Sequence, residues 1–186
     1  MKFIKIYSKK YLILFLGLFL SFASYSQKYT EYDVKAAYLY NFSKFITWPN
    51  EQKDINKNFV FVVYKNEAFA KVLMEVIKER KIKGRNCKVV LVNKPEDIPN
   101  CNILFVSNVS NIEIKNIFNF INSKPIVTVG DNIEDFCKKG GIINFTSKQS
   151  TKRFELNVNL ANKKEIKISS KLIVLAKIVQ SKYAVF

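Results

Sequence analysis

FVFVVY, at residues Phe59–Tyr64, is the stretch that decides the fold. An uninterrupted apolar run of this length, rich in valine and aromatic residues, predicts a strand that is buried on both faces. Asn66 is the expected N-cap of a helix whose apolar residues recur at helical spacing as far as Ile77, and Gly84 lies beyond its end. A buried strand followed by an amphipathic helix is the building unit of a parallel sheet.

The same unit repeats along the chain. Three further apolar runs predict strands at Cys87–Val92, Asn102–Ser107 and Pro125–Val129, and a helix capped by Asn111 is expected before the last of them. Another helix, over Glu31–Thr47, precedes the first strand and ends at a Trp-Pro pair. The apolar stripe of this first helix, which we expect to be buried, consists of Val34, Ala37, Tyr38, Phe42 and Phe45.

The last third of the chain changes character. A short helical turn over Ile133–Lys138 ends at two glycines, and the segments Ile142–Phe145 and Arg153–Asn159 flank a polar loop, which predicts a β-hairpin. Ser169 is expected to cap a closing helix that extends to Val179. We therefore predict one α/β domain over residues 27–186, with a mainly parallel sheet flanked by helices on both faces, a C-terminal β-hairpin and a closing helix.

The first 26 residues have the features of a secretory signal peptide. A basic segment is followed by the apolar run Tyr11–Phe22 and by small residues at Ala23–Ser26, so cleavage is expected between Ser26 and Gln27. The apolar run is shorter than the roughly 20 residues that span a bilayer. Export of the mature chain is the expectation, and an uncleaved N-terminal anchor is the alternative.

Export places the cysteines in a compartment that permits disulfides. Because the chain has 3 cysteines, at least one stays free or pairs between chains. Cys87 and Cys101 are nearest in sequence and each begins a predicted strand, so a disulfide between them is one interpretation, and it leaves Cys137 unpaired. The other interpretation is that all three are buried thiols that pack as small apolar residues.

Two absences exclude most enzyme classes. The chain has 0 His, which excludes Ser-His-Asp and Cys-His triads and histidine-based zinc motifs, and its 5 Gly cannot form a GxGxxG or Walker A loop. Its neighbouring acidic residues lie at predicted helix starts or in polar loops, where carboxylates stabilise helix N-termini. We therefore predict a protein that is not an enzyme, with no catalytic residue, no metal and no cofactor.

The formal net charge of +16 suggests nucleic acid as a partner, but the residue types argue against it. Only Arg80, Arg85 and Arg153 are arginines, and specific base readout relies on bidentate arginine contacts. No specific nucleic-acid partner is expected. Adhesion of a basic surface to anionic lipid or polymer is an alternative, and salt would abolish it.

The late predicted strand carries a row of polar residues. Arg153, Glu155 and Asn157 alternate with apolar residues, and the period of two places them on one face. This is either an ordinary half-solvated face or a row that faces a pocket or a partner. Asn41 falls on the apolar stripe of the first helix, and because a buried amide needs a hydrogen-bond partner, we hypothesise that Glu155 or Asn157 supplies it.

Aromatic residues are concentrated on the first helix. Tyr38, Tyr40 and Trp48 are among more aromatics than one core face can bury, and exposed ones would form a protein-interaction surface. The candidate partner- or ligand-binding residues are therefore Tyr38, Tyr40, Asn41, Trp48, Arg153, Glu155 and Asn157.

Taken in order, six segments resemble the YfiR family over roughly Tyr29 to Val179. The most specific are the first helix, which ends in a Trp-Pro pair, and the late Phe-Glu-Leu-Asn strand. The segments are VKAAYLYNFSKFITWP (Val34–Pro49), CNILFVS (Cys101–Ser107), PIVTVGD (Pro125–Asp131), KKGGIINF (Lys138–Phe145), RFELNVNLA (Arg153–Ala161) and SSKLIVLAKIV (Ser169–Val179).

The resemblance implies a small periplasmic α/β protein without catalytic activity. It would restrain an inner-membrane diguanylate cyclase by binding its periplasmic portion, and so control cyclic di-GMP and biofilm formation, and it would form a homodimer. The cysteines depart from the family pattern, because the predicted first strand and the strand after the glycine pair carry none; Cys101 and Cys137 resemble the remaining halves of two family pairs.

We therefore expect an exported, non-enzymatic regulator that binds the periplasmic part of an inner-membrane signalling protein, either a diguanylate cyclase or a sensor kinase. A periplasmic small-ligand-binding module built on Arg153, Glu155 and Asn157 is the alternative.

Overall fold

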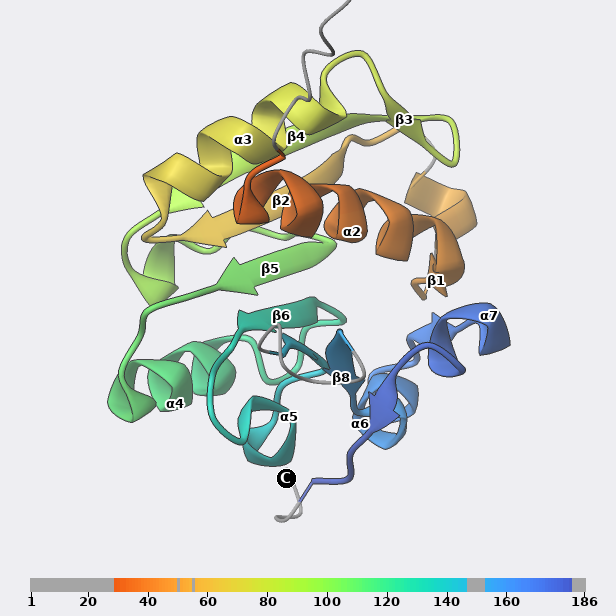
Figure 1. The fold of residues 1–186 in the computed structure, drawn as a ribbon. Helices are drawn as coiled ribbons and strands as arrows, with labels where there is room; N and C mark the ends of the chain where they lie inside the picture. Colours follow the sequence, from red (N-terminus) through yellow and green to blue (C-terminus); the bar gives the residue numbers. More distant parts are fainter. Residues whose placement is uncertain (1–28, 50, 55, 147–152, 182–186) are drawn as a thin grey trace, which may run out of the picture.

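The computed structural model describes residues 29–49, 51–54, 56–146 and 153–181 (Figure 1). The predicted signal peptide, residues 1–26, and the polar loop of the predicted hairpin, residues 147–152, lie outside the described residues. Within the described ranges, no helix combines the length and the apolar character that a bilayer crossing needs.

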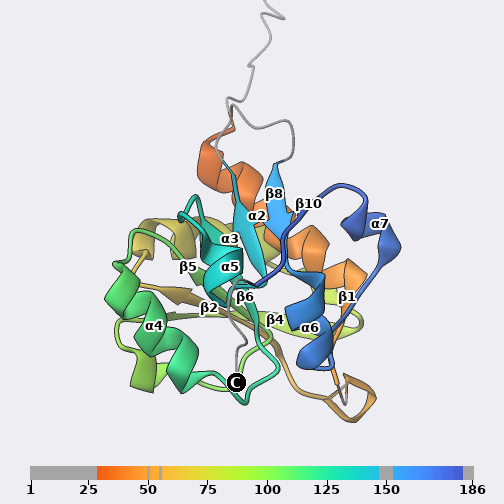
Figure 2. The ribbon, with the colours of Figure 1, turned by 90° about the horizontal axis from the view of Figure 1, so that it is seen from below.

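A mixed, mostly parallel sheet forms the centre of the described fold (Figures 1 and 2). Its strands are β2 (Phe59–Tyr64), β3 (Lys81–Ile82), β4 (Arg85–Val92), β5 (Ile103–Val106), β6 (Val127–Asp131), β7 (Ile143–Phe145), β8 (Phe154–Leu156) and β10 (Lys177–Ile178). They lie in the order β10-β8-β7-β6-β5-β2-β4-β3. The pairs β3–β4 and β7–β8 are antiparallel, and the other neighbours are parallel.

The strand predicted at Phe59–Tyr64 is confirmed as β2 and lies in the interior of the sheet, with β4 on one side and β5 on the other. All of its residues except Val60 are buried, as the continuous apolar run predicts. From β2 the chain adds β4 on one side and then returns to add β5, β6 and β7 on the other. This is a doubly wound arrangement, and its strand order reverses between β2 and β5.

Helices cover both faces of the sheet, which confirms the predicted α/β class (Figure 1). Phe59, Phe61 and Val63 point to the core beneath α2 and α3, whereas Val62 and Tyr64 point to the core beneath α4. The helices are α2 (Glu31–Phe45), α3 (Glu67–Ile77), α4 (Asn111–Phe120), α5 (Phe136–Lys139), α6 (Val158–Lys163) and α7 (Ser170–Ile173), with 3₁₀ turns η1 (Glu51–Asp54) and η2 (Pro95–Asp97). A separate two-stranded sheet pairs β1 (Ile46–Thr47) with β9 (Lys167–Ile168).

The buried face of α2 agrees with the predicted stripe at Phe42 but not at Val34 or Phe45. Val34 is 46% exposed and Phe45 is 39% exposed, although both belong to the stripe that was expected to be buried. Apolar residues occur almost all round this helix, so periodicity alone does not single out one face. The face that packs on the sheet consists of Ala36, Leu39, Phe42 and Ser43.

The predicted β-hairpin is confirmed by the antiparallel pairing of β7 with β8, but the segments after it are shorter than expected. The strand predicted over Arg153–Asn159 stops at Leu156, because the Asn157 side chain accepts a hydrogen bond from the Leu160 N–H and caps α6. The predicted closing helix is only the four residues of α7, capped by Ser169 as expected, and the chain then pairs with β8 as β10.

One other predicted cap is wrong by a single position. Helix α4 is capped by Ser110, not by Asn111, because Ser110 and Glu113 form a reciprocal capping box.

Candidate functional site

Helix α2 runs from the carboxyl end of the parallel strands to their amino end. Its first turn lies at their carboxyl end, where the Lys35 ammonium contacts Asp131 Oδ1 at 2.5 Å and Glu31 Oε1 at 2.6 Å. Burial by itself lowers the pKa of Lys35, but the bonds to Asp131 and Glu31 outweigh burial and raise this pKa above its ordinary value. The lysine therefore stays charged and holds α2 against β6.

Polar side chains at the point where the strand order reverses bond to one another. In doubly wound sheets this is the place where ligands bind. Here the Asn66 amide donates to the Ser107 hydroxyl at 2.8 Å and to the Tyr32 hydroxyl at 3.2 Å, and Lys65 pairs with Glu113 at 2.6 Å. Tyr32, in the first turn of α2, thus supplies a hydrogen-bond partner at the place where a ligand binds in other doubly wound proteins.

Trp48, a predicted site residue, lies at the opposite end of α2 and is only 5% exposed. Its Nε1–H donates to the Asn102 carbonyl at 3.1 Å, and its ring meets Phe59 edge-on at 5.1 Å. Trp48 and Pro49 stand between two surface clefts and contribute to both. Their position, and not their exposure, makes this pair part of a candidate site.

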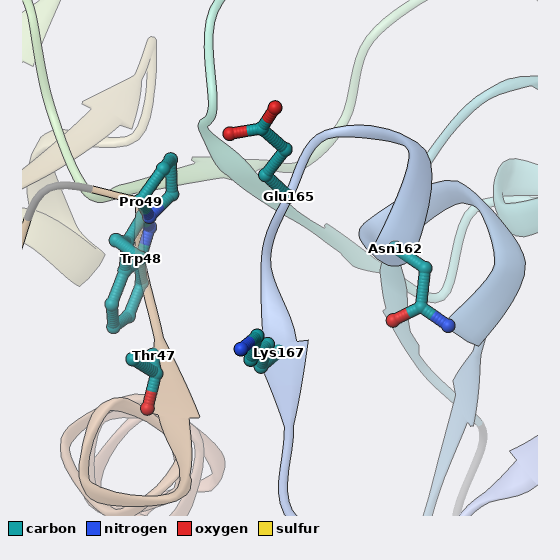
Figure 3. Close-up of a pocket in the computed structure, with 6 residues that line it drawn as sticks. All are labelled: Thr47, Trp48, Pro49, Asn162, Glu165 and Lys167. Atoms are coloured by element: carbon teal, nitrogen blue, oxygen red, sulfur yellow. The ribbon is translucent and has the colours of Figure 1, made fainter.

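The first of these clefts has a volume of about 600 Å³ (Figure 3). Trp48 and Pro49 form one wall, and the segment from α6 to β9, with Asn162, Glu165 and Lys167, forms the other. The walls come from distant parts of the sequence, and the pairing of β1 with β9 brings them together. The lining combines an acidic, a basic and an amide side chain, all exposed.

The turn between α6 and β9 is fastened to the rest of the domain by Lys164. Its ammonium donates to the carbonyl of Asn122 at 2.6 Å and to that of Lys124 at 3.1 Å, just beyond the end of α4. Burial lowers the pKa of Lys164. A lysine at the C-terminal end of a helix satisfies carbonyls that have no partner within the helix, so this contact sets the position of one wall of the cleft.

The structure brings two other predicted residues, Tyr38 and Arg153, to one cleft of about 420 Å³, which also includes Val34. Its aromatic floor is built by Tyr38, whose ring packs on Phe145 at 5.9 Å and on Phe154 at 6.4 Å. Tyr38 is therefore partly a core residue and partly a surface residue.

Tyr40 lies apart from this cleft. The cations of Lys44 and Arg80 lie 4.1 Å and 5.0 Å from the centre of its ring. The structure thus gives Tyr40 a cation–π role at the surface beside α3.

The hypothesis about Asn41 is wrong. Asn41 is exposed, and its side chain accepts a hydrogen bond from Lys44 at 3.3 Å. It lies with Val34 and Phe45 on the exposed side of α2. Neither Glu155 nor Asn157 is its partner. Glu155 pairs with Lys177 at 3.0 Å, whereas Asn157 is fully buried.

A buried amide was predicted at Asn41, but the fully buried amide is Asn157. Its side-chain nitrogen donates to the Cys137 carbonyl at 2.9 Å and to the Ser181 hydroxyl at 2.7 Å, while its oxygen caps α6. The three residues of the predicted polar row therefore have different roles. Arg153 lines a cleft, Glu155 pairs with Lys177 on the neighbouring strand, and Asn157 makes buried structural hydrogen bonds.

The disulfide considered between Cys87 and Cys101 is not formed, and Cys87, Cys101 and Cys137 are all free thiols. Strand β2 lies between β4, which contains Cys87, and β5, which follows Cys101. Cys87 and Cys101 also pack against opposite faces of the sheet. Burial raises the pKa of Cys101 to about 12 and raises that of Cys137 as well.

An apolar surface near α7 was missed by the sequence analysis. Val174, Leu175 and Ile178 are 67%, 58% and 50% exposed. The signal was present, because helical spacing in the predicted closing helix gives Leu172, Ile173, Ala176 and Val179 as its apolar stripe, and these three residues fall outside it. We call these three residues, together with Phe45, the edge patch.

Within the described ranges, no group of three or more Cys, Asp or Glu side chains is arranged to hold a metal ion. The candidate groups that remain are those around α2, the two clefts at Trp48 and the edge patch.

A family model described as YfiR/HmsC-like matches residues 32–177, from the second residue of α2 to the first residue of β10. No curated protein matches the chain. The matched range contains the Trp48–Pro49 pair, the hairpin and most of the edge patch. Proteins of this kind are regulators and not enzymes, and the match supports in general terms a periplasmic protein that acts with an inner-membrane diguanylate cyclase. The chain belongs to the YfiR/HmsC-like family.

Proposed function

We propose that this protein restrains an inner-membrane diguanylate cyclase by binding its periplasmic part through the edge patch. The observation that supports this proposal is the exposure of Phe45, Val174, Leu175 and Ile178 at one border of the molecule. Soluble domains seldom leave apolar side chains grouped in this way unless another surface covers them. Lower cyclic di-GMP in the cell is the expected consequence of binding.

Two features place the members of the patch together. The Ser169 N–H donates to the Phe45 carbonyl at 2.9 Å, so the end of α2 lies beside the start of α7 (Figure 2). Ile178 is paired with Leu156, which belongs to the core beneath α2. Since residues paired across two strands share a face of the sheet, Ile178 lies on the face that α2 covers, at its border.

The border strand offers a second mode of contact. β10 is the last strand of the sheet within the described residues, and one of its sides therefore pairs with no strand there. A strand edge next to exposed apolar side chains suits recognition by strand addition, in which main-chain hydrogen bonds supply affinity and side-chain pockets supply specificity. The short length of β10 limits self-association through the same edge.

Site-specific photocrosslinking tests the proposal. A photoreactive amino acid is placed at Leu175 in the edge patch and, as the matched control, at Ile112, which is 74% exposed on α4. Irradiation of intact cells should join position 175, but not position 112, to a membrane protein that carries a cyclase domain. A crosslink to a sensor kinase, or only to a second copy of this chain, would contradict the proposal.

The functional consequence is measured with charged variants at the same positions. Leu175→Glu should raise cellular cyclic di-GMP to the level of a strain without the protein, because a carboxylate in an apolar interface is costly to desolvate. Ile112→Glu should leave cyclic di-GMP at the wild-type level. Equal effects of the two variants would show that the patch has no special role.

A further inference from the structure

We propose that the second cleft beside Trp48 binds a small phosphate-bearing molecule, with Arg85 as its buried anchor. This cleft of about 570 Å³ lies along the amino ends of β2, β5 and β6. It is independent of the edge patch, so its test does not depend on the proposed partner.

Arg85 is a buried cation without a buried counter-charge. The side chain is 5% exposed at the start of β4. Its Nε donates to the Lys57 carbonyl at 2.9 Å, and its Nη2 donates to the Asn58 carbonyl at 2.7 Å and to Asn102 Oδ1 at 3.4 Å. Among the described residues, no carboxylate lies within ion-pair distance of Arg85 and Nη1 donates to no oxygen.

This arrangement is unusual for a structural arginine. A buried charge is costly unless an opposite charge compensates it. The Phe59 ring, whose centre lies 5.4 Å from the guanidinium carbon, and the Asp54 carboxylate, which lies beyond ion-pair distance, offset only part of the Arg85 charge, and the oxygen acceptors satisfy only its hydrogen bonds. The same hydrogen bonds fix the guanidinium rigidly at the cleft, so that little further ordering is needed when an anion binds. Arg85 is thus preorganised for a ligand that brings negative charge.

The rest of the cleft is also positive. Lys57 and Lys124 line it with Arg85, and Asp54, which pairs with Lys57 at 2.6 Å, is the only carboxylate among the lining residues that the structure describes. Asn102 adds a neutral donor, since its side-chain oxygen accepts from the Val60 N–H while its nitrogen donates to no acceptor within the described part of the chain.

These donors favour phosphate over a carboxylate. A phosphate monoester carries up to two negative charges and three terminal oxygens, which match the excess of two cations and the separate donors of this cleft. Pro49, Pro125 and Ile126 provide apolar lining for the organic part of the ligand. At the carboxyl end of the sheet, by contrast, Lys35 and Lys65 are already paired with the carboxylates of Asp131 and Glu113.

Trp48 provides the measurement, because it is the only tryptophan of the chain and lines the cleft. Its fluorescence is recorded while inorganic phosphate, phenyl phosphate or benzoate is added at constant ionic strength. We expect a saturable change with both phosphates, stronger binding of phenyl phosphate than of inorganic phosphate, and weak binding of benzoate.

Charge-removing variants locate the site. Lys124→Gln removes one charged donor and should weaken phosphate binding about tenfold. Arg85→Gln should abolish binding, and its thermal unfolding shows whether it remains folded. Lys88→Gln, which removes an exposed lysine from the same strand outside the cleft, should bind like the wild type.

Three results would overturn the proposal. One is the absence of a saturable response to either phosphate, and another is equal weakening by Lys88→Gln and Lys124→Gln, which indicates only a general effect of positive charge. The third is tighter binding of benzoate than of phenyl phosphate, which would assign the cleft to carboxylates.

Discussion

Replacement of Asn157 by alanine should lower the free energy of unfolding by about 2–4 kcal/mol. The loss of an N-cap side chain costs about 1 kcal/mol, and Asn157 caps α6 through the Leu160 N–H at 3.0 Å. The same change leaves the Cys137 carbonyl without its donor at 2.9 Å, and an unsatisfied buried group costs about 1–3 kcal/mol.

Asn41 is the matched control for this variant. Both residues are asparagines, but Asn41 is exposed on α2 and bonds only to Lys44. Asn41→Ala should change the free energy of unfolding by less than about 0.5 kcal/mol, or raise it slightly, because alanine favours helix more than asparagine does.

The assay is urea unfolding followed by the fluorescence of Trp48, which is buried in the folded chain. A destabilisation by Asn157→Ala of less than about 1 kcal/mol would show that the two hydrogen bonds do not contribute as argued. An equal or larger loss in Asn41→Ala would contradict the finding that Asn157 is buried and Asn41 is exposed.

Three further predictions concern pH, reactivity and packing. The hydrogen bond from Lys65 lowers the pKa of Glu113 to about 2 from its ordinary 4.5. The contribution of Glu113 to stability is therefore present above pH 4.5 and lost as the pH falls through 2. Urea unfolding should show Glu113→Gln less stable than the wild type at pH 6 and equal to it near pH 2. Burial raises the pKa of Cys101 to about 12. Iodoacetamide at pH 8 should therefore label Cys101 at least about a hundredfold more slowly in the native than in the unfolded protein, as measured by mass spectrometry. Rapid labelling of the native protein would refute the burial of this thiol. Gly141→Ala would place a methyl group against the buried ring of Phe136 and should lower the free energy of unfolding in urea by about 1–3 kcal/mol. An unchanged value would contradict the tight packing.

The architecture was predictable because its signals are local. The apolar run of β2 and the helix capped by Asn66 are periodic patterns of neighbouring residues, and periodicity determines which backbone conformation buries them. The order of family segments also predicted the YfiR/HmsC-like match, since that order does not depend on the packing.

The candidate site was predicted only in part. Trp48, Tyr38 and Arg153 line clefts, whereas a partner- or ligand-binding role for them stays a prediction. Arg85 was noted in the sequence only as one of three arginines, because nothing in its neighbours shows that it is buried at a cleft.

The sequence by itself determined the class of the fold, its parallel strands and the nature of the late hairpin. Tertiary structure alone decided which face of α2 is buried, that Asn157 and not Asn41 is the buried amide, and that β2 separates Cys87 from Cys101. The physical reason is that strand and helix formation follow from short-range patterns. Burial and pairing depend on residues far apart in sequence that only the completed sheet brings together.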